Sequence, residues 1–191
     1  MKYLLLFLGA LIFWSCNNAP AGAQSTGTVV GKVNPRAPLR QEADDRDKKD
    51  ADSFVIRMGE ATAAPGDKVC LPVETAGFKQ LTGLQFTMRF DSAALEFQSV
   101  RGMTLPGYSV SNFGLRFAER GYVTTLWFDS ALKGQTQPDG KKLFEICFTN
   151  LQKPGEETEV KFQDGPTYFE VIKADMSQLR FVYANGKVMT K

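Results

Sequence analysis

The chain has 191 residues, which is enough for one domain of ordinary size and additional segments. Its 23 lysines and arginines nearly balance its 21 aspartates and glutamates, so the formal charge is only +2. The sequence has no basic stripe interleaved with aromatic residues, so a nucleic-acid partner is not expected. It contains no histidine, which excludes catalysis by a Ser-His-Asp or Cys-His arrangement and any histidine ligand to a metal.

The N-terminus has the composition of an export signal. The apolar run 4–14 is too short to span a bilayer and is typical of a secretory signal. It leads into Phe13-Trp14-Ser15-Cys16, and a small residue directly before a cysteine resembles the lipobox of bacterial lipoproteins, in which that cysteine is lipidated. Phe13 stands where leucine is commonest in that motif. We expect a lipoprotein signal peptide over 1–15, lipidation at Cys16, and an exported protein anchored to the bacterial cell envelope, at the outer membrane and facing either the periplasm or the outside. Ordinary secretion or a short membrane anchor is the alternative.

Residues 16–52 are predicted to form a flexible, charged tether. Residues 17–38 are rich in Asn, Ala, Gly, Pro, Ser and Thr, a composition that favours a linker. The segment 40–52, "RQEADDRDKKDAD", has four positive and six negative charges and no aromatic residue. It has too little apolar area to offset the entropy of ordering, so we expect it to stay solvated.

From Ser53 onward, short strands alternate with turns, and no segment is long and periodic enough for an α-helix. An Asn185-Gly186 pair near the C-terminus is typical of a type I′ hairpin turn. The pattern predicts one all-β domain over 53–191, an antiparallel β-sandwich of about eight to ten strands. The segments from which these strands are drawn cover 54–58, 69–75, 84–90, 95–100, 108–114, 115–121, 122–129, 143–150, 158–165, 168–175 and a closing hairpin over 179–190.

The strand 84–90 alternates cleanly and then stops at an aspartate. Leu84, Phe86, Met88 and Phe90 fall on one face, which predicts a half-buried strand. Asp91-Ser92 opens a turn because both side chains can bond nearby backbone amides, and a second apolar run begins at Leu95. These local rules explain the break but not its purpose.

The order of these motifs resembles the cohesin family. The family's pattern is a Gly-Asp turn into a Val-x-x-Pro-Val strand, an aromatic strand that ends at an aspartate, Leu-Glu-Phe, and a late strand of the type Leu-Phe-x-Ile-x-Phe. Here these motifs are "PGDKVCLPVET", "LQFTMRFDSAALEF" and "KKLFEICFTN", with "PTYFEV" near the end, and together they extend over almost all of residues 54–190. Ser92 stands where the family usually has proline.

This resemblance implies a jelly-roll sandwich of about nine strands in which the kink at Asp91 carries the chain from one sheet to the other. Cohesins hold dockerins, which are small calcium-loaded helical modules, on the face of one sheet, and they share their architecture with cellulose-binding modules. The expected function is therefore a non-catalytic module that binds a dockerin-like protein, although cohesin-like lipoproteins without a known dockerin partner also exist.

The predicted binding face follows from strand parity. In the strand 84–90 the polar positions point away from the core, and in the strand 122–129 an inward Trp127 leaves apolar residues outside. A contiguous exposed apolar patch usually marks an interface. A covering loop, the tether or self-association is the alternative. The predicted partner-binding face comprises Gln85, Thr87, Arg89, Tyr122, Thr124, Leu126 and Phe128.

Carbohydrate binding, for attachment to a polysaccharide, is the alternative function. It needs exposed coplanar aromatic rings, whereas most phenylalanines here occupy core positions and Trp127 is expected inside. Catalysis is not expected because the available acids, Asp91, Asp129 and Glu170, are interpreted as turn or strand-end residues. The sequence contains no Asp-x-Asp-x-Asp-Gly loop, so a calcium site is not expected. No cofactor is expected either.

Beyond Cys16, only Cys70 and Cys147 remain, an even pair in an exported chain. Strand parity places both on the side opposite the core, because their neighbours in "VCLPV" and "LFEICF" are apolar. The cohesin resemblance implies that the two strands are neighbours in one sheet, so a disulfide is possible. Two unpaired thiols at different heights along the strands are the alternative.

Overall fold

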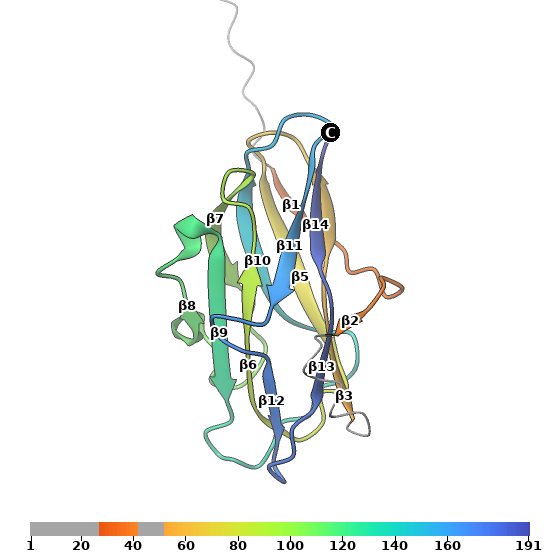
Figure 1. Cartoon of the computed structure of the whole chain (residues 1–191), viewed down its shortest axis with the longest axis vertical. Helices are drawn as coiled ribbons and strands as arrows, with labels where there is room; N and C mark the ends of the chain where they lie inside the picture. Colours follow the sequence, from red (N-terminus) through yellow and green to blue (C-terminus); the bar gives the residue numbers. More distant parts are fainter. Residues whose placement is uncertain (1–26, 42–51) are drawn as a thin grey trace, which may run out of the picture.

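The computed structural model describes residues 27–41 and 52–191, and this part of the chain is a β-sandwich (Figure 1). Its fourteen strands form two sheets of seven strands each. The first sheet contains β1 (Thr28–Val30), β2 (Arg40–Gln41), β3 (Ser53–Met58), β5 (Lys68–Ala76), β7 (Leu95–Arg101), β10 (Lys141–Asn150) and β13 (Arg180–Ala184). The second sheet contains β4 (Glu60–Ala63), β6 (Leu81–Arg89), β8 (Phe113–Gly114), β9 (Tyr122–Phe128), β11 (Glu157–Gln163), β12 (Glu170–Lys173) and β14 (Gly186–Thr190). No helix among the described residues is long and apolar enough to cross a membrane.

The strand order confirms the predicted sandwich. The first sheet runs β2-β13-β3-β5-β10-β7, with β1 beside β5, and the second runs β4-β14-β11-β6-β9-β8, with β12 beside β6. Most neighbours are antiparallel, while β1 with β5, β3 with β13 and β4 with β14 are parallel. There are more strands than the predicted nine or so, partly because the chain changes sheet between β3 and β4 and again between β13 and β14.

The kink at Asp91 carries the chain between the sheets, as the resemblance implied. β6, before it, belongs to the second sheet, and β7, after it, belongs to the first. The Asp91 carboxylate accepts a hydrogen bond from the Ala93 amide at 2.9 Å, and the Asp91 carbonyl accepts one from the Leu95 amide at 2.9 Å. The aspartate therefore holds the turn that exchanges sheets.

The core between the sheets is largely aromatic. Phe86 of β6 packs against Phe144 and Phe162, with ring centroids 6.4 and 5.5 Å away, in the range that aromatic pairs prefer. Trp127 of β9 is buried, and its indole nitrogen donates to the Pro106 carbonyl at 2.9 Å. This side chain fixes the parity of β9, so the alternate positions of that strand face outward.

The predicted closing hairpin is wrong. β13 pairs with β2 and β3 in the first sheet, whereas β14 pairs with β4 and β11 in the second. Gly186 does not have the positive φ that a type I′ turn requires. A Cβ at Gly186 would lie 2.7 Å from Met58, so this glycine allows close approach rather than a turn. Asn185 accepts a hydrogen bond from the Phe162 amide. This bond holds the connection at which the chain crosses from β13 in the first sheet to β14 in the second.

The predicted flexible tether is also wrong for residues 27–41. β1 pairs in parallel register with β5, and β2 pairs with β13. The Gly31 amide donates to the Cys70 carbonyl at 2.8 Å, and Lys32 and Glu60 exchange backbone hydrogen bonds. The segment is ordered because sheet edges with unpaired backbone groups are available to it. Residues 1–26, including Cys16, and residues 42–51 lie outside the described residues.

Candidate protein-binding face

The outer surface of the second sheet carries the residues predicted for partner binding. In the antiparallel pair of β6 and β9, Gln85 lies opposite Leu126, Thr87 opposite Thr124, and Arg89 opposite Tyr122. The last predicted residue, Phe128, is opposite Gly83. All seven predicted positions therefore occupy one face, as the parity of Trp127 requires.

The exposure of these side chains matches the prediction in part. Leu126 is 47% exposed and Phe128 is 58% exposed, and Arg89 is also exposed. Gln85, Tyr122 and Thr124 are half-buried. The half-burial of Tyr122 has a direct cause, since the Arg89 guanidinium lies over its ring at 4.7 Å and donates a hydrogen bond to its hydroxyl.

Thr87 is the exception, because it is fully buried and not part of the accessible face. Its hydroxyl donates to the Thr167 carbonyl at 2.9 Å and accepts from the Thr167 amide at 3.0 Å. The loop between β11 and β12 is thereby fastened over the middle of the sheet. The threonine positions a loop that shapes the face and offers no polar group to a partner.

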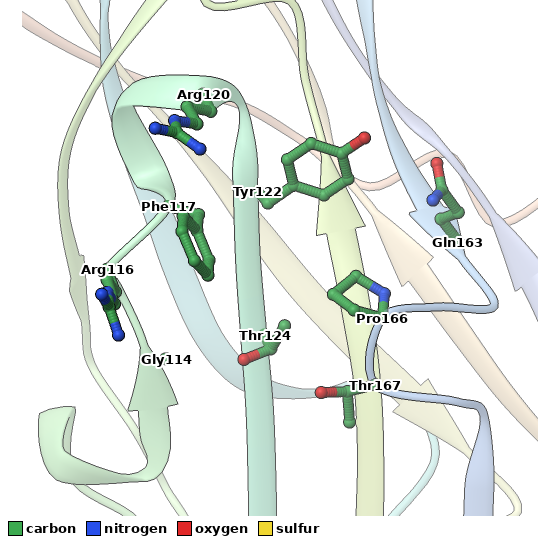
Figure 2. A pocket seen from close by; sticks show the side chains of 9 residues that line it. All are labelled: Gly114, Arg116, Phe117, Arg120, Tyr122, Thr124, Gln163, Pro166 and Thr167. Carbon is green, nitrogen blue, oxygen red and sulfur yellow. The ribbon is translucent and has the colours of Figure 1, made fainter.

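Beside this loop lies a groove of about 630 Å³, which we call the arginine groove. Figure 2 shows Arg116, Phe117 and Arg120 along one side, Gln163, Pro166 and Thr167 along the other, and Tyr122 and Thr124 between them. Gly114 completes the lining, and a Cβ there would lie 2.3 Å from the Thr124 hydroxyl, so the absence of a side chain lets β8 lie close to β9.

Sequence reasoning did not place Arg116, Phe117 and Arg120 on this face. The segment 115–121 was predicted as a strand, but it forms a short 3₁₀ helix, Ala118–Arg120, ended by Gly121. Gly121 has a φ of 81°, the left-handed conformation that commonly ends a helix. Its position after "FAER" is the signal that could have identified the helical turn.

The arginines of the groove rest on aromatic rings. Arg116 and Arg120 lie 5.5 and 5.6 Å from the centre of the Phe117 ring, distances at which a guanidinium is attracted to a ring face. All three side chains are exposed. The arrangement holds two guanidinium groups at one rim with their N–H donors available.

The opposite end of the face is apolar. Leu126 and Phe128 border a depression of about 160 Å³ beside Gln85, Glu170 and Ile172. Glu170 accepts a hydrogen bond from Gln178 at 3.3 Å. One sheet face thus combines a cationic end and an apolar end.

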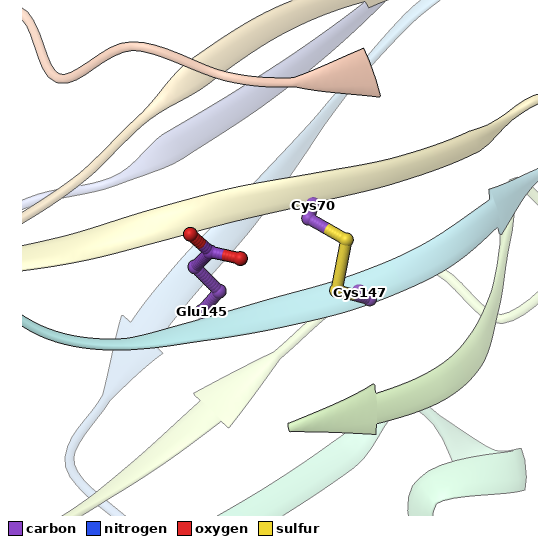
Figure 3. A group of neighbouring side chains, drawn as sticks. All are labelled: Cys70, Glu145 and Cys147. Carbon is purple, nitrogen blue, oxygen red and sulfur yellow. A yellow bond between two sulfur atoms is a disulfide. The ribbon is translucent and has the colours of Figure 1, made fainter. Parts of the chain in front are cut away.

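The predicted cysteine pair is a disulfide on the outer side of the first sheet. Cys70 of β5 lies directly opposite Cys147 of β10, with a Cα–Cα distance of 4.0 Å (Figure 3). Both side chains lie on the side of the sheet away from the core, as expected. Neither has any solvent-exposed surface, which was not expected. The bridge links the two strands at the centre of this sheet.

Glu145 lies beside the disulfide (Figure 3), and two cations hold it. Its carboxylate accepts from Lys142 at 2.6 Å and from Arg101 at 2.7 Å. Burial acts to raise the pKa of Glu145, but these hydrogen bonds prevail and hold it below the usual value. Since both sulfurs are bonded to each other and both carboxylate oxygens have partners, the cluster is structural.

The acids considered for catalysis have structural roles in the described part of the chain. Asp129 accepts hydrogen bonds from the backbone amides of Ala131, Lys133 and Gly134, so it closes the loop after β9. Loss of hydration acts to raise the pKa of Asp129, but these amides hold it below its usual value. Asp91 holds the crossing turn, and Glu170 bonds a glutamine. These contacts agree with the interpretation of the acids as turn and strand-end residues.

Comparison with known proteins gives a consistent result. A model of the cohesin domain matches residues 54–188. No curated protein sequence is significantly similar to the chain. A cohesin from Clostridium thermocellum in a type I cohesin–dockerin complex is 16% identical, with a TM-score of 0.62, over 73% of this chain and 100% of that one.

Two further solved structures are similar. The sixth cohesin of scaffoldin B from Acetivibrio cellulolyticus, in complex with a dockerin, is 20% identical, with a TM-score of 0.61, over 73% of this chain and 99% of that one. A non-cellulosomal cohesin from the archaeon Archaeoglobus fulgidus is 17% identical, with a TM-score of 0.59, over 73% of this chain and 91% of that one. At such identities the likeness shows the fold.

Proposed function

The chain belongs to the cohesin family, and we propose that its domain is a non-catalytic module that holds a dockerin-like protein on the outer face of the second sheet. The observation that carries the proposal is the exposure of Leu126 and Phe128 side by side on β9. Apolar side chains on a sheet face are costly to leave in water, and they typically mark an interface. The dockerin complexes of similar cohesins support the choice of partner.

A polysaccharide ligand fits this face less well. Trp127, the single tryptophan of the domain, is in the core, and its N–H group donates a hydrogen bond to the Pro106 carbonyl. On β9, Phe128 offers one exposed ring, and the Leu126 side chain beside it offers none for a sugar chain to stack on. A protein surface with apolar side chains is therefore the better match.

We further propose that the domain is held at the cell envelope by a lipid on Cys16, which lies outside the described residues. The small residue before Cys16 and the short apolar run preceding it support this proposal. Replacing Cys16→Ser should move the protein from the membrane fraction to the soluble fraction. Membrane association that survives this change, with no lipid mass on the chain, would refute the anchor.

Partner binding is tested by affinity capture from the native organism with residues 17–191 as bait. The expected product is a protein with a dockerin module, identified by mass spectrometry and lost when calcium is chelated. Leu126→Asp should abolish capture. Leu151→Asp is the matched control, because Leu151 is 49% exposed but follows β10 of the first sheet. Equal capture by both variants, or recovery of a glycan alone, would contradict the proposal.

A further inference from the structure

The arginine groove has cations without carboxylate partners. None of the ion pairs in the described part of the chain involves Arg89, Arg116 or Arg120. Their contacts are with the faces of Tyr122 and Phe117. This end of the face therefore carries positive charge that no ion pair among the described residues neutralises.

Several other cations of the domain are paired with carboxylates of the chain. Arg101 and Lys142 share Glu145, and Lys187 pairs with Glu157 at 3.1 Å. Lys161, which is opposite Arg89 in the neighbouring strand, pairs with Glu159 at 3.7 Å. What distinguishes the groove is the placement of two exposed, unpaired arginines over one aromatic ring, in a chain whose total charge is only +2.

We propose that the arginine groove is an anion subsite that receives the carboxylates of an acidic segment on the protein partner. The inference rests on the proposed function and names the chemistry of the partner's contact surface. A guanidinium matches a carboxylate with two parallel N–H···O bonds, which makes arginine the preferred residue for such recognition. Stacking on Phe117 limits the motion of both guanidinium groups, so less entropy is lost when they bind.

The groove and the apolar end are within reach of one partner element. Tyr122 lines the groove and Phe128 lies at the other end of the same strand. The six residue-to-residue steps from Tyr122 to Phe128 in an extended strand span about 20 Å. A partner helix of about 13 residues covers that distance. It would place apolar side chains on Leu126 and Phe128 and acidic side chains in the groove.

This continuity favours a protein segment over an acidic polysaccharide. A uronic acid chain would satisfy the arginines but would leave Leu126 and Phe128 uncovered or in contact with hydroxyl groups. An acidic protein segment with an apolar continuation satisfies both ends. The charge also sets the order of events, because long-range attraction steers an acidic partner to the groove before the apolar contacts form.

The test uses the full chain and two probes, a fluorescent hexaglutamate peptide and polygalacturonate, in titrations at low and moderate salt. Hexaglutamate should bind and should weaken as salt rises, because the contacts are ionic. The double variant Arg116→Gln with Arg120→Gln should bind the peptide about tenfold more weakly. Arg36→Gln is the control, because Arg36 is an exposed arginine on the segment beside the first sheet. It should bind as the unaltered chain does.

Three results would overturn the inference: no hexaglutamate binding, equal binding by the double variant and the unaltered chain, or groove-dependent binding of polygalacturonate alone. Failure here is distinguishable from failure of the proposed function. If a dockerin-bearing partner is captured and lost with Leu126→Asp but retained by the double arginine variant, the function stands and the subsite does not. If hexaglutamate binds in the groove and no protein is captured, the subsite stands and the dockerin assignment fails.

Discussion

The outer faces of the two sheets use similar residue types in opposite ways. On the first sheet, Arg101 and Lys142 surround the buried Glu145, and the neighbouring cysteines are bonded to each other. On the second sheet, Arg116 and Arg120 rest on Phe117 with no carboxylate among the described residues paired to them, and Leu126 faces solvent. A cluster whose groups satisfy one another contributes to stability, whereas exposed groups with free charge and apolar area are suited to bind another molecule. Substitutions in the Glu145 cluster and the disulfide should therefore change stability alone, and those of the exposed residues on the outer face of the second sheet should change binding alone.

The largest expected effect comes from the disulfide. Replacing both Cys70 and Cys147 with alanine removes a bridge between residues 77 positions apart. In the chain-entropy model this lowers the free energy of unfolding by roughly 4 kcal/mol. Urea unfolding measures the change, and partner capture by the folded fraction should stay the same. An unchanged urea midpoint would show that the bridge does not stabilise the first sheet.

The next effect belongs to the apolar end of the second sheet. Phe128→Asp places a charge where we propose that a partner buries a ring, and it should weaken binding by about 2 kcal/mol or more. The free energy of unfolding should change by less than about 0.5 kcal/mol, because Phe128 is exposed. Calorimetric titration of the captured partner and urea unfolding provide the two readings. A large loss of stability with unchanged binding would reverse the roles assigned to the two faces.

A smaller effect, dependent on pH, is expected at Glu145. Its folded-state pKa is held below the ordinary value of 4.5 by Lys142 and Arg101, although burial opposes them. A depressed carboxyl pKa stabilises the fold above 4.5, and this stabilisation disappears as pH falls through the folded-state value. Glu145→Gln should therefore cost about 1–2 kcal/mol at pH 7, and the two proteins should converge in acid. The measurement is the urea midpoint of both proteins from pH 7 to pH 3. A difference between the two midpoints that stays constant with pH would mean that the ion pairs contribute nothing.

The smallest expected effect concerns the tyrosine of the groove. Tyr122→Phe keeps the ring under Arg89 but removes the hydroxyl that accepts its hydrogen bond. Since the ring contact remains, hexaglutamate affinity should change by no more than about twofold, whereas Tyr122→Ala should weaken it further. The same peptide titration compares the two variants. Equal losses would mean that the hydroxyl, and not the ring, positions Arg89.

Local patterns in the sequence predicted much of the fold. Alternation gave the parity of β9 and of the cysteine strands, because successive side chains of any strand point to opposite faces of the sheet. Asp91 could be recognised as a break from its own turn chemistry, and the cohesin resemblance supplied its purpose. The partners of each strand lie far away in the sequence, and for this reason the crossing at Asn185 was mistaken for a hairpin.

The site was less predictable than the fold. Thr87 has the parity of an exposed residue, and only its bonds to Thr167, eighty residues later, bury it. Arg116 and Arg120 reach the face because Gly121 ends a short 3₁₀ helix where a strand was expected. Residues 27–41 look like a linker by composition, but open sheet edges gave them pairing partners. For Thr87 and for residues 27–41, a contact from a distant segment outweighed the local pattern.

Binding of a protein partner to the outer face of the second sheet is tested most directly by site-specific photocrosslinking. A benzophenone amino acid is placed at Phe128 in one protein and at Leu151 in another, and each is illuminated with the captured partner. A crosslinked partner is expected from position 128 and none from position 151. Crosslinking from position 151 with none from position 128 would contradict it.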